Sequence, residues 1–183
     1  MNLAALASGP TEAIPLADPT FFTGENDPRG KLLVAARERL TAARSLEEII
    51  EIVRSTARAV TSADGVTFIL REGDLCHYVE EDAIGPLWKG RRFPMDACIS
   101  GWAMIHGKTA AIPDIYSDAR IPHDAYRPTF VKSLVMAPVG GGSAVAALGA
   151  YWAEERSFTA REIAAVESLA ASVGEAMVTV KAA

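Results

Sequence analysis

Amphipathic helical patterns at both ends of the chain enclose a middle that is rich in short strand patterns. From about Lys31 apolar residues recur at steps of three and four, and a last stripe of the same kind runs over residues 163–180. Between them, β-branched and aromatic runs alternate with turns that contain glycine and aspartate. Links of hairpin length favour antiparallel pairing of these strands. The order therefore predicts an α+β domain in which terminal helices cover one face of an antiparallel sheet.

The N-terminal helical pattern is divided into two helices. The first has Leu32, Ala36 and Leu40 on one face. The second begins at Ser45, because Ser45 with Glu48 three residues later is typical of a capping box, which satisfies backbone N–H groups at a helix start. The apolar face of this second helix consists of Leu46, Ile49, Ile50, Val53, Ala57 and Val60. Two consecutive helices, or one helix with a break at Arg44 or Ser45, therefore precede the first strand.

The middle of the chain alternates strand patterns with turns. In chain order, we expect strands over residues 66–70, 75–79, 91–94, 109–112, 131–139 and 143–153, the last being the longest. The first two form a hairpin around the turn at residues 72–74. A short helix over residues 99–105 ends at Gly107, because glycine readily adopts the left-handed conformation of a helix cap. Residues 113–130 are expected to form a long loop with at most a helical turn or two.

The C-terminal helix begins with a second capping box. Thr159 is followed three residues later by Glu162, and Phe158 and Ile163 are spaced for a hydrophobic staple. The apolar stripe of this helix consists of Ile163, Val166, Leu169, Val173, Met177 and Val180. Its alternating steps of three and four are close to a coiled-coil seam, so we expect this helix to take part in dimerisation.

Length and charge limit the classes of function. A chain of 183 residues is long enough for one sizeable core and too short for two ordinary domains. Its 18 Lys and Arg against 23 Asp and Glu lack the basic excess of proteins that bind nucleic acids or anionic membranes. Without a basic leader region or an apolar run of bilayer length, we expect a soluble cytoplasmic protein. Two irregularly spaced cysteines predict free thiols.

We expect residues 1–29 to form a flexible arm and residues 30–183 to form the domain. The prolines of the arm, which interrupt backbone hydrogen bonding, are Pro10, Pro15, Pro19 and Pro28. Phe21 and Phe22 are adjacent aromatics in this arm, and we interpret them as a docking point onto the domain or a partner.

Several segments resemble a known family. The segments ISGWAMIHGKTAAIPDI, VKSLVMAPV and SAVAALGAYW, in this order between terminal helices, resemble the GAF domain over residues 45–180. More narrowly, CHYVEEDAIGPLWKGRRFPMDACISGW and DAYRPTFVKSLVMAPV are similar to the GAF modules that precede the kinase core of bacterial HWE-type sensor histidine kinases. The resemblance implies a sensory module of bacterial two-component signalling, dimeric through its terminal helices, with a histidine kinase as output. It does not carry over kinase activity itself.

Cys76 and His77 are adjacent, and a Cys-His pair marks bilin attachment in phytochrome-like GAF domains. That attachment site lies in the loop after the middle strands, whereas Cys76 falls in the early hairpin, and residues 116–132 contain no cysteine. Side chains of neighbouring residues on a strand point to opposite faces, so this pair is unsuited to act as nucleophile and base. We interpret Cys76 as a buried cysteine.

Cys98 invites comparison with another GAF branch, the free methionine sulfoxide reductases. The positions that this branch fills with cysteine correspond to Ser100 and His123 here, so we expect neither a nucleophilic nor a resolving thiol and interpret Cys98 as a small residue at a helix start. The histidines and cysteines show no paired spacing of metal ligands. We therefore expect no cofactor, no metal site and no catalytic residue.

A pocket between the sheet and the loop at residues 113–130 is the remaining candidate site. Binding sites are commonly apolar and aromatic with a few polar anchors. The candidate ligand-binding residues are Tyr78, Trp88, Trp102, Asp114, Tyr116, Tyr126, Arg127, Phe130, Ser133 and Tyr151. Because strand side chains alternate, only one of Tyr151 and Trp152 can face this pocket. The alternative is that the aromatic residues simply fill the core of a small domain.

Three functional hypotheses follow from these observations. The first is a non-enzymatic sensory GAF module that binds a small molecule and signals through its terminal helices at a dimer interface. The second is a ligand-free domain for protein interaction or dimerisation. The third, a bilin photoreceptor or a thiol redox enzyme, depends on Cys76 or Cys98.

Overall fold

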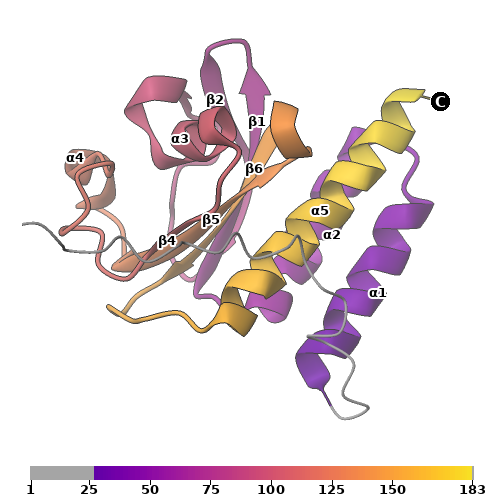
Figure 1. Cartoon of the computed structure of the whole chain (residues 1–183), viewed down its shortest axis with the longest axis horizontal. Coiled ribbons are helices and arrows are strands. Elements are labelled where there is room, and N and C mark those ends of the chain that lie inside the picture. The colour runs from indigo at the N-terminus through magenta and orange to yellow at the C-terminus, as the bar shows by residue number, and fades with distance from the viewer. Residues whose placement is uncertain (1–26, 183) are drawn as a thin grey trace, which may run out of the picture.

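The computed structural model describes residues 27–182, which form helices at both ends and a sheet between them (Figure 1). The helices are α1 (Pro28–Ala42), α2 (Leu46–Thr61), α3 (Ile99–His106), α4 (His123–Tyr126) and α5 (Ala160–Ala182), with short 3-10 turns at Met95–Ala97 and Gly141–Ser143. The strands are β1 (Gly65–Glu72), β2 (Leu75–Ala83), β3 (Arg92–Pro94), β4 (Ala110–Ile112), β5 (Ser133–Val139) and β6 (Ala146–Trp152).

The strands form one curled sheet in the order β3-β2-β1-β6-β5-β4, and every neighbouring pair is antiparallel. Helices α1, α2 and α5 pack together on one face of this sheet (Figure 1). Helices α3 and α4 and the connecting loops lie on the other face. The predicted α+β sandwich is therefore confirmed.

The alternation of strand side chains divides the interior into two cores, one on each face of the sheet. On β5, Val135 packs with the terminal helices, whereas Leu134 and Met136 pack with α3 and the loops. On β6, Trp152 belongs to the helix-side core and Tyr151 to the opposite one. As expected, only one of this last pair faces the loops.

The capping box of α5 forms as predicted, whereas at α2 the Ser45 cap forms but the Glu48 carboxylate accepts from the Arg44 N–H instead of the Ser45 N–H. The Glu48 N–H donates to Ser45 Oγ at 3.1 Å and begins α2. The Glu162 N–H donates to Thr159 Oγ1 at 3.2 Å, and the Thr159 N–H donates back to the Glu162 carboxylate at 2.9 Å. Both patterns are local, which is why sequence spacing alone finds them.

Some predicted boundaries are wrong. Pro28 does not interrupt structure but begins α1, because the first turn of a helix needs no proline N–H and the Asp27 carboxylate caps it. Leu33, not Leu32, lies on the buried face of α1. Strand β2 is longer than β6, which starts only at Ala146 because a 3-10 turn precedes it. Phe21 and Phe22 lie outside the described residues.

The apolar stripe of α5 is used inside the molecule. Leu169 and Val173, the centre of the expected coiled-coil seam, are fully buried against α1, α2 and the sheet. In length and composition α5 meets the criterion for a membrane-spanning helix, but 56% of its most apolar window is buried in the fold. A core helix has the same composition, so packing on the sheet accounts for the apolar character of α5.

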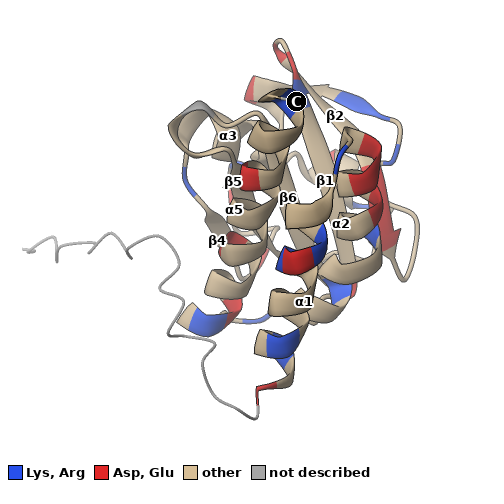
Figure 2. Ribbon diagram, turned by 90° about the vertical axis from the view of Figure 1, so that its right-hand side faces the viewer, with Lys and Arg blue, Asp and Glu red and all other residues tan. Residues whose placement is uncertain are grey.

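The outward sides of the terminal helices carry charges of both signs (Figure 2). Helices α1 and α5 run parallel, since Asp27 pairs with Arg161 near their N-termini and Arg37 pairs with Glu175 further along. Exposed ion pairs of this kind contribute little stability individually.

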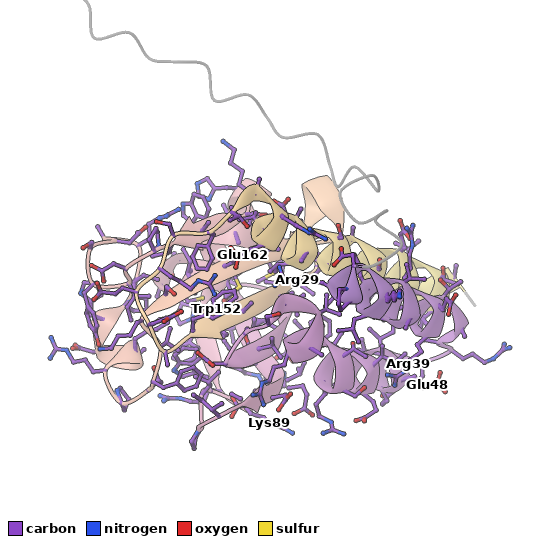
Figure 3. All side chains as sticks on the ribbon, turned by 90° about the horizontal axis from the view of Figure 1, so that it is seen from below. Arg29, Arg39, Glu48, Lys89, Trp152 and Glu162 are labelled. Atoms are coloured by element: carbon purple, nitrogen blue, oxygen red, sulfur yellow. The ribbon has the colours of Figure 1, made fainter. Side chains whose placement is uncertain are left out.

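Trp152, labelled in Figure 3, contributes more, because its ring packs on Phe158 and its indole N–H donates to the Ser62 carbonyl at 3.0 Å.

Candidate functional site

Trp88 is the centre of an aromatic cluster on the face of the sheet opposite α5. Its ring centroid lies 4.7 Å from that of Tyr126, 5.6 Å from that of Tyr78 and 5.6 Å from that of Tyr151, each in an edge-to-face arrangement. Phe93 packs edge-on against Tyr78 at 5.5 Å. We call these five residues the aromatic cluster. Four of the sequence-predicted site residues therefore come together in it.

Glu81 holds Trp88 in place, and sequence analysis missed this residue. Its carboxylate accepts hydrogen bonds from the backbone N–H groups of Leu87, Trp88 and Lys89 at 3.1, 2.8 and 2.8 Å. The indole N–H of Trp88 donates to the Ala125 carbonyl at 3.1 Å. The loop between β2 and β3 is thus tied to the sheet on one side and to α4 on the other.

A β-bulge explains why Glu81 reaches this loop. In the β1–β2 ladder Phe68 pairs with Glu80 but Ile69 pairs with Tyr78, so one residue of β2 has no partner. An extra residue reverses the facing of everything beyond it. Glu81 therefore shares the face of Thr67 and the aromatic cluster. Plain alternation from Tyr78 puts Glu80 there instead, which is how the pattern misleads.

Tyr151 lies over a glycine that leaves room for its ring. A Cβ built on Gly149 would be 2.4 Å from the Tyr151 hydroxyl and 2.8 Å from Met136 Cε. This position brings the Tyr151 hydroxyl to 2.8 Å from Thr67 Oγ1 on β1. Burial raises the pKa of Tyr151, and burial likewise raises that of Tyr78 and Tyr126, so all three hydroxyls are neutral at physiological pH.

We expect Tyr151→Phe to lower the free energy of unfolding by about 1.5 kcal/mol, because the Thr67 hydroxyl loses its buried partner. The double variant Tyr151→Phe/Thr67→Val should lose less than the sum of the single variants, since no polar group then remains unpaired. Urea unfolding of the four proteins measures the coupling. Additive losses would show that the two hydroxyls do not interact.

A chain of hydrogen bonds runs from the aromatic cluster to the start of α3. The Tyr78 hydroxyl lies 3.1 Å from Ser100 Oγ, which lies 3.2 Å from Cys98 Sγ. Cys76 of β2 belongs to the same buried cluster as Cys98, and each of the two thiols shifts the pKa of the other. All four groups are buried. The two cysteines that the sequence presents as separate core residues are therefore one thiol pair.

A small pocket of about 10 Å³ lies at this point, room for about one water molecule. Its lining consists of Tyr78, Trp88, Phe93, Cys98, Pro122, Ala125 and Tyr126. Within the described residues, every buried side-chain nitrogen and oxygen has a hydrogen-bond partner. The site is thus closed by its own aromatic side chains, and no Asp, Glu, Lys, Arg or His side chain lines it.

The other predicted site residues lie around the cluster or away from it. Phe130 lies at its edge, where a Cβ on Gly65 would be 2.8 Å from the ring. Trp102 is half-buried, stacks on His106 and lies 4.4 Å beneath the Arg120 guanidinium. Neither residue lines the pocket.

Three more of them lie on the surface of the loop that follows β4. The Asp114 carboxylate accepts from the Tyr116 N–H at 2.9 Å and so shapes its own turn, while Tyr116 is 41% exposed. The Ser117 hydroxyl, above all, lowers the pKa of Asp114. Arg127 points to solvent and pairs with Asp124 at 3.5 Å. These side chains are not brought together into one site.

Ser133 lies on the helix-facing side of the sheet. It pairs directly with Trp152 in the β5–β6 ladder, and its hydroxyl donates to the Glu154 carbonyl at 2.8 Å. Its buried hydroxyl is therefore satisfied at the far side from the pocket. Within residues 27–182 no group of three or more His, Cys, Asp or Glu side chains is placed to hold a metal ion.

Fold and site together define an α+β domain with a closed aromatic cavity on one face of its sheet and the helices of both chain ends packed on the other. The chain belongs to the GAF domain family, whose model matches residues 43–178. This match is to the family in general, and no comparison supports the narrower likeness to HWE-type kinases. No curated protein matches the sequence at a significant level.

Solved structures share the fold at low sequence identity. The GAF domain of a phosphoenolpyruvate-protein phosphotransferase from Coxiella burnetii is 16% identical with a TM-score of 0.73, over 84% of this chain and 95% of that one. The free methionine-R-sulfoxide reductase of Neisseria meningitidis is 13% identical with a TM-score of 0.72, over 84% and 90%. A phycocyanobilin-bound GAF domain of a cyanobacterial phytochrome is 18% identical with a TM-score of 0.69, over 84% and 96%. Because one neighbour is an enzyme, the fold alone does not decide whether this chain is one.

Proposed function

We propose that the chain is a cytoplasmic, non-enzymatic sensory module of signal transduction that binds a small molecule beside Trp88. The observation that carries this proposal is the position of the pocket. Pro122, Ala125 and Tyr126 form its outer wall, and all three belong to the segment at residues 113–130. A ligand larger than the pocket displaces this segment when it binds, so occupancy changes the conformation of the protein.

The chemistry of the lining favours a small, uncharged ligand with apolar character. The pocket offers aromatic faces, the Cys98 sulfur and two tyrosine side chains, and no Asp, Glu, Lys, Arg or His side chain. Burying a charge without a partner is costly. The charged candidates Asp114 and Arg127 are engaged with their own neighbours at the surface. A planar neutral molecule that replaces an aromatic side chain against Trp88 meets these conditions.

A direct connection links the pocket wall to the start of α5. The Arg156 N–H donates to the Pro113 carbonyl at 3.1 Å, at the beginning of the segment that carries Tyr126. The Arg156 side chain pairs with Glu162, which belongs to the capping box of α5. Movement of residues 113–130 therefore acts on the residues that begin α5. Differential packing of α5 in the two states is the proposed output.

Amide NMR titration of the purified chain with a library of small neutral compounds tests this proposal. A ligand is expected to shift amides of residues 122–126 first and those of Arg156 and Glu162 with the same binding constant. Glu162→Gln should keep binding while weakening the response at α5. A ligand that shifts only the pocket amides would contradict the coupling. Finding no binder, and no molecule co-purifying in native mass spectrometry, would contradict the sensory function.

A second candidate, a ligand-free interaction domain, is favoured by the tight filling of the cavity. Tyr78, Trp88 and Tyr126 are each only 3% exposed, so the closed state is fully packed. In this case the terminal helices form the interaction surface. Their partners are a second copy of the chain and, on the sequence resemblance, a histidine kinase. The pocket then serves stability alone, and the NMR titration distinguishes the two candidates.

We expect the homodimer to form through apolar side chains that α1 and α5 leave exposed. Val34 on α1 is 56% exposed and Val178 on α5 is 68% exposed. The variant Val34→Glu/Val178→Glu should weaken self-association at least about tenfold without lowering the melting temperature, because both changes are at the surface. Sedimentation equilibrium measures the dissociation constant. Ile105→Glu, an equally exposed site on α3, is the matched control.

A purely monomeric wild type at high concentration would contradict this interface. An effect of Ile105→Glu equal to that of the helix variant would place the interface on the other side of the molecule. Leu169 and Val173 are unsuitable for this test because they are fully buried, so their variants would unfold the core.

A further inference from the structure

Cys76 and Cys98 meet although 22 positions separate them and they come from different elements. Cys76 lies on β2, where it pairs with Phe93, and its side chain is fully buried on the cavity face. Cys98 lies at the start of α3 and is 6% exposed. Both are free thiols of one buried cluster, and the Cys98 thiol donates to the carbonyl of Pro94, the residue next to the cross-strand partner of Cys76. Each thiol also shifts the pKa of the other. The fold thus places a second thiol near Cys98, although the two cysteines are far apart in the sequence.

The surroundings of Cys98 favour its thiolate. Cys98 is the N-cap residue of α3, at the positive end of the helix dipole; its sulfur makes no capping hydrogen bond, but the nearby backbone of Ser100 and Gly101 lowers its pKa. The Ser100 hydroxyl is within 3.2 Å and itself lies 3.1 Å from the Tyr78 hydroxyl. When Cys98 loses its proton, Tyr78 can donate to Ser100 and Ser100 to the sulfur. Only the bond from the thiol to the Pro94 carbonyl, at 3.4 Å, is then lost.

Titration divides the roles between the two thiols. Interaction with Cys76, together with Ser100 and the α3 backbone, lowers the pKa of Cys98 to about 6 against the opposing effect of burial. Interaction with Cys98, followed by burial, raises the pKa of Cys76, so Cys76 stays protonated. The other titratable or charged groups facing the pair are Arg71 of β1, Tyr78 of β2, Tyr126 of α4 and Tyr151 of β6. None of the three tyrosines changes charge between pH 5 and 8, since burial raises their pKa.

We propose that Cys76 and Cys98 form a reversible oxidation site for small hydroperoxides, with Cys98 as the attacking sulfur and Cys76 as the resolving one. The Cys98 sulfur attacks one peroxide oxygen, the O–O bond breaks, and hydroxide leaves and is protonated to water. Cys98 is then a sulfenic acid. The Cys76 sulfur gives up its proton and attacks the Cys98 sulfur, and the sulfenic oxygen leaves as a second water. The two thiols lose two electrons in total, and one hydrogen peroxide becomes two waters.

Access to the pair is through the pocket described above. Cys98 is part of its lining, with Pro122 and Ala125 on the outer side. Hydrogen peroxide is only slightly larger than water, so a small opening of residues 122–126 admits it, whereas bulky thiol reagents are excluded. A disulfide between β2 and the start of α3 would draw these two elements together at the pocket. Oxidation therefore reaches the same wall that a ligand would move.

Intact-mass analysis of the full chain after treatment with hydrogen peroxide tests the proposal. In the folded protein we expect loss of two hydrogens, no alkylation after denaturation, a peptide that joins Cys76 to Cys98, and full reversal by dithiothreitol. In Cys76→Ser we expect a sulfenic acid at Cys98 that dimedone traps when it is added together with denaturant. In Cys98→Ser we expect Cys76 to remain an unmodified thiol. Persistence of both thiols at a peroxide concentration that oxidises the urea-unfolded chain would overturn the proposal.

A separate measurement tests which cysteine attacks the peroxide and which resolves the sulfenic acid. Ser100→Ala should slow oxidation at pH 6 by about fivefold, because loss of a hydrogen bond to a charged group raises the Cys98 pKa by about one unit and so lowers the thiolate fraction from about one half to about one tenth. The oxidation rate of the wild type should be half-maximal near pH 6, well below the pKa of an ordinary thiol. Equal rates for wild type and Ser100→Ala, or oxidation of Cys76 before Cys98, would overturn the assignment. The result is independent of the ligand proposal, since a chain that binds no compound in the NMR titration can still form this disulfide.

Discussion

Gly101→Ala is expected to destabilise the protein by about 3 kcal/mol or more, a large part of the stability of a domain of this size. A Cβ at position 101 would lie 1.9 Å from the Met95 carbonyl oxygen and 2.5 Å from Met95 Cα. The clashing atoms belong to the backbone, so no side-chain rotation relieves them. Helix α3 must move away from the 3-10 turn at Met95–Ala97.

Urea unfolding followed by circular dichroism measures this loss, and Gly142→Ala is the matched control. A Cβ at Gly142 meets nothing within 4 Å, so that change should stay within about 0.5 kcal/mol of wild type. The displacement of α3 also moves the backbone of Ser100 and Gly101, which lowers the Cys98 pKa, so peroxide oxidation of Gly101→Ala should be slower. Unfolding of Gly101→Ala at the wild-type urea concentration would show that α3 is not seated on Met95.

Trp88→Ala is the second change with a large expected effect, about 3 to 5 kcal/mol. It removes the ring that contacts Tyr78, Tyr126 and Tyr151, and it leaves the Ala125 carbonyl without its donor. The cavity that results has the size and shape of an indole and is walled by aromatic rings. Cavities of this kind in protein cores stay apolar and bind matching compounds.

Indole should therefore raise the melting temperature of Trp88→Ala and leave wild type unchanged, since only the variant has room for it. Trp102→Ala is the control, because Trp102 is half-buried outside the pocket and should cost about 1 kcal/mol with no indole response. Rescue of Trp88→Ala demonstrates that a planar neutral molecule can occupy the site beside Tyr126. An equal shift of all three proteins by indole would mean binding elsewhere.

The local signals in the sequence predicted local structure well. The N-terminal caps of α2 and α5, the break between α1 and α2, and the alternation that separates Tyr151 from Trp152 follow from residues that are close in sequence. Family membership rests on the same kind of signal, since motif order over most of the chain suffices to identify a GAF domain. The narrower assignment to HWE-type kinases needed more than these segments provide.

The candidate site was predictable only in part. Aromatic type and position in the cavity-forming segments singled out Tyr78, Trp88, Tyr126 and Tyr151, which do meet. The predicted polar anchors do not line the pocket. Asp114, for example, lies in an exposed loop, where its carboxylate accepts a hydrogen bond from the backbone of its own turn. No composition rule distinguishes a side chain that lines a pocket from one that shapes a turn.

Sequence alone determined that this chain folds as an α+β GAF domain, because helix periodicity, strand alternation and caps depend on neighbours a few residues apart. Only the tertiary structure decided which side chains come together in the cavity. The bulge in β2 turned Glu81 toward Trp88, the close approach at Gly101 placed α3 on Met95, and that placement brought Cys98 to Cys76. Such contacts depend on strand register and helix packing between residues that are far apart in the sequence, which no local pattern encodes.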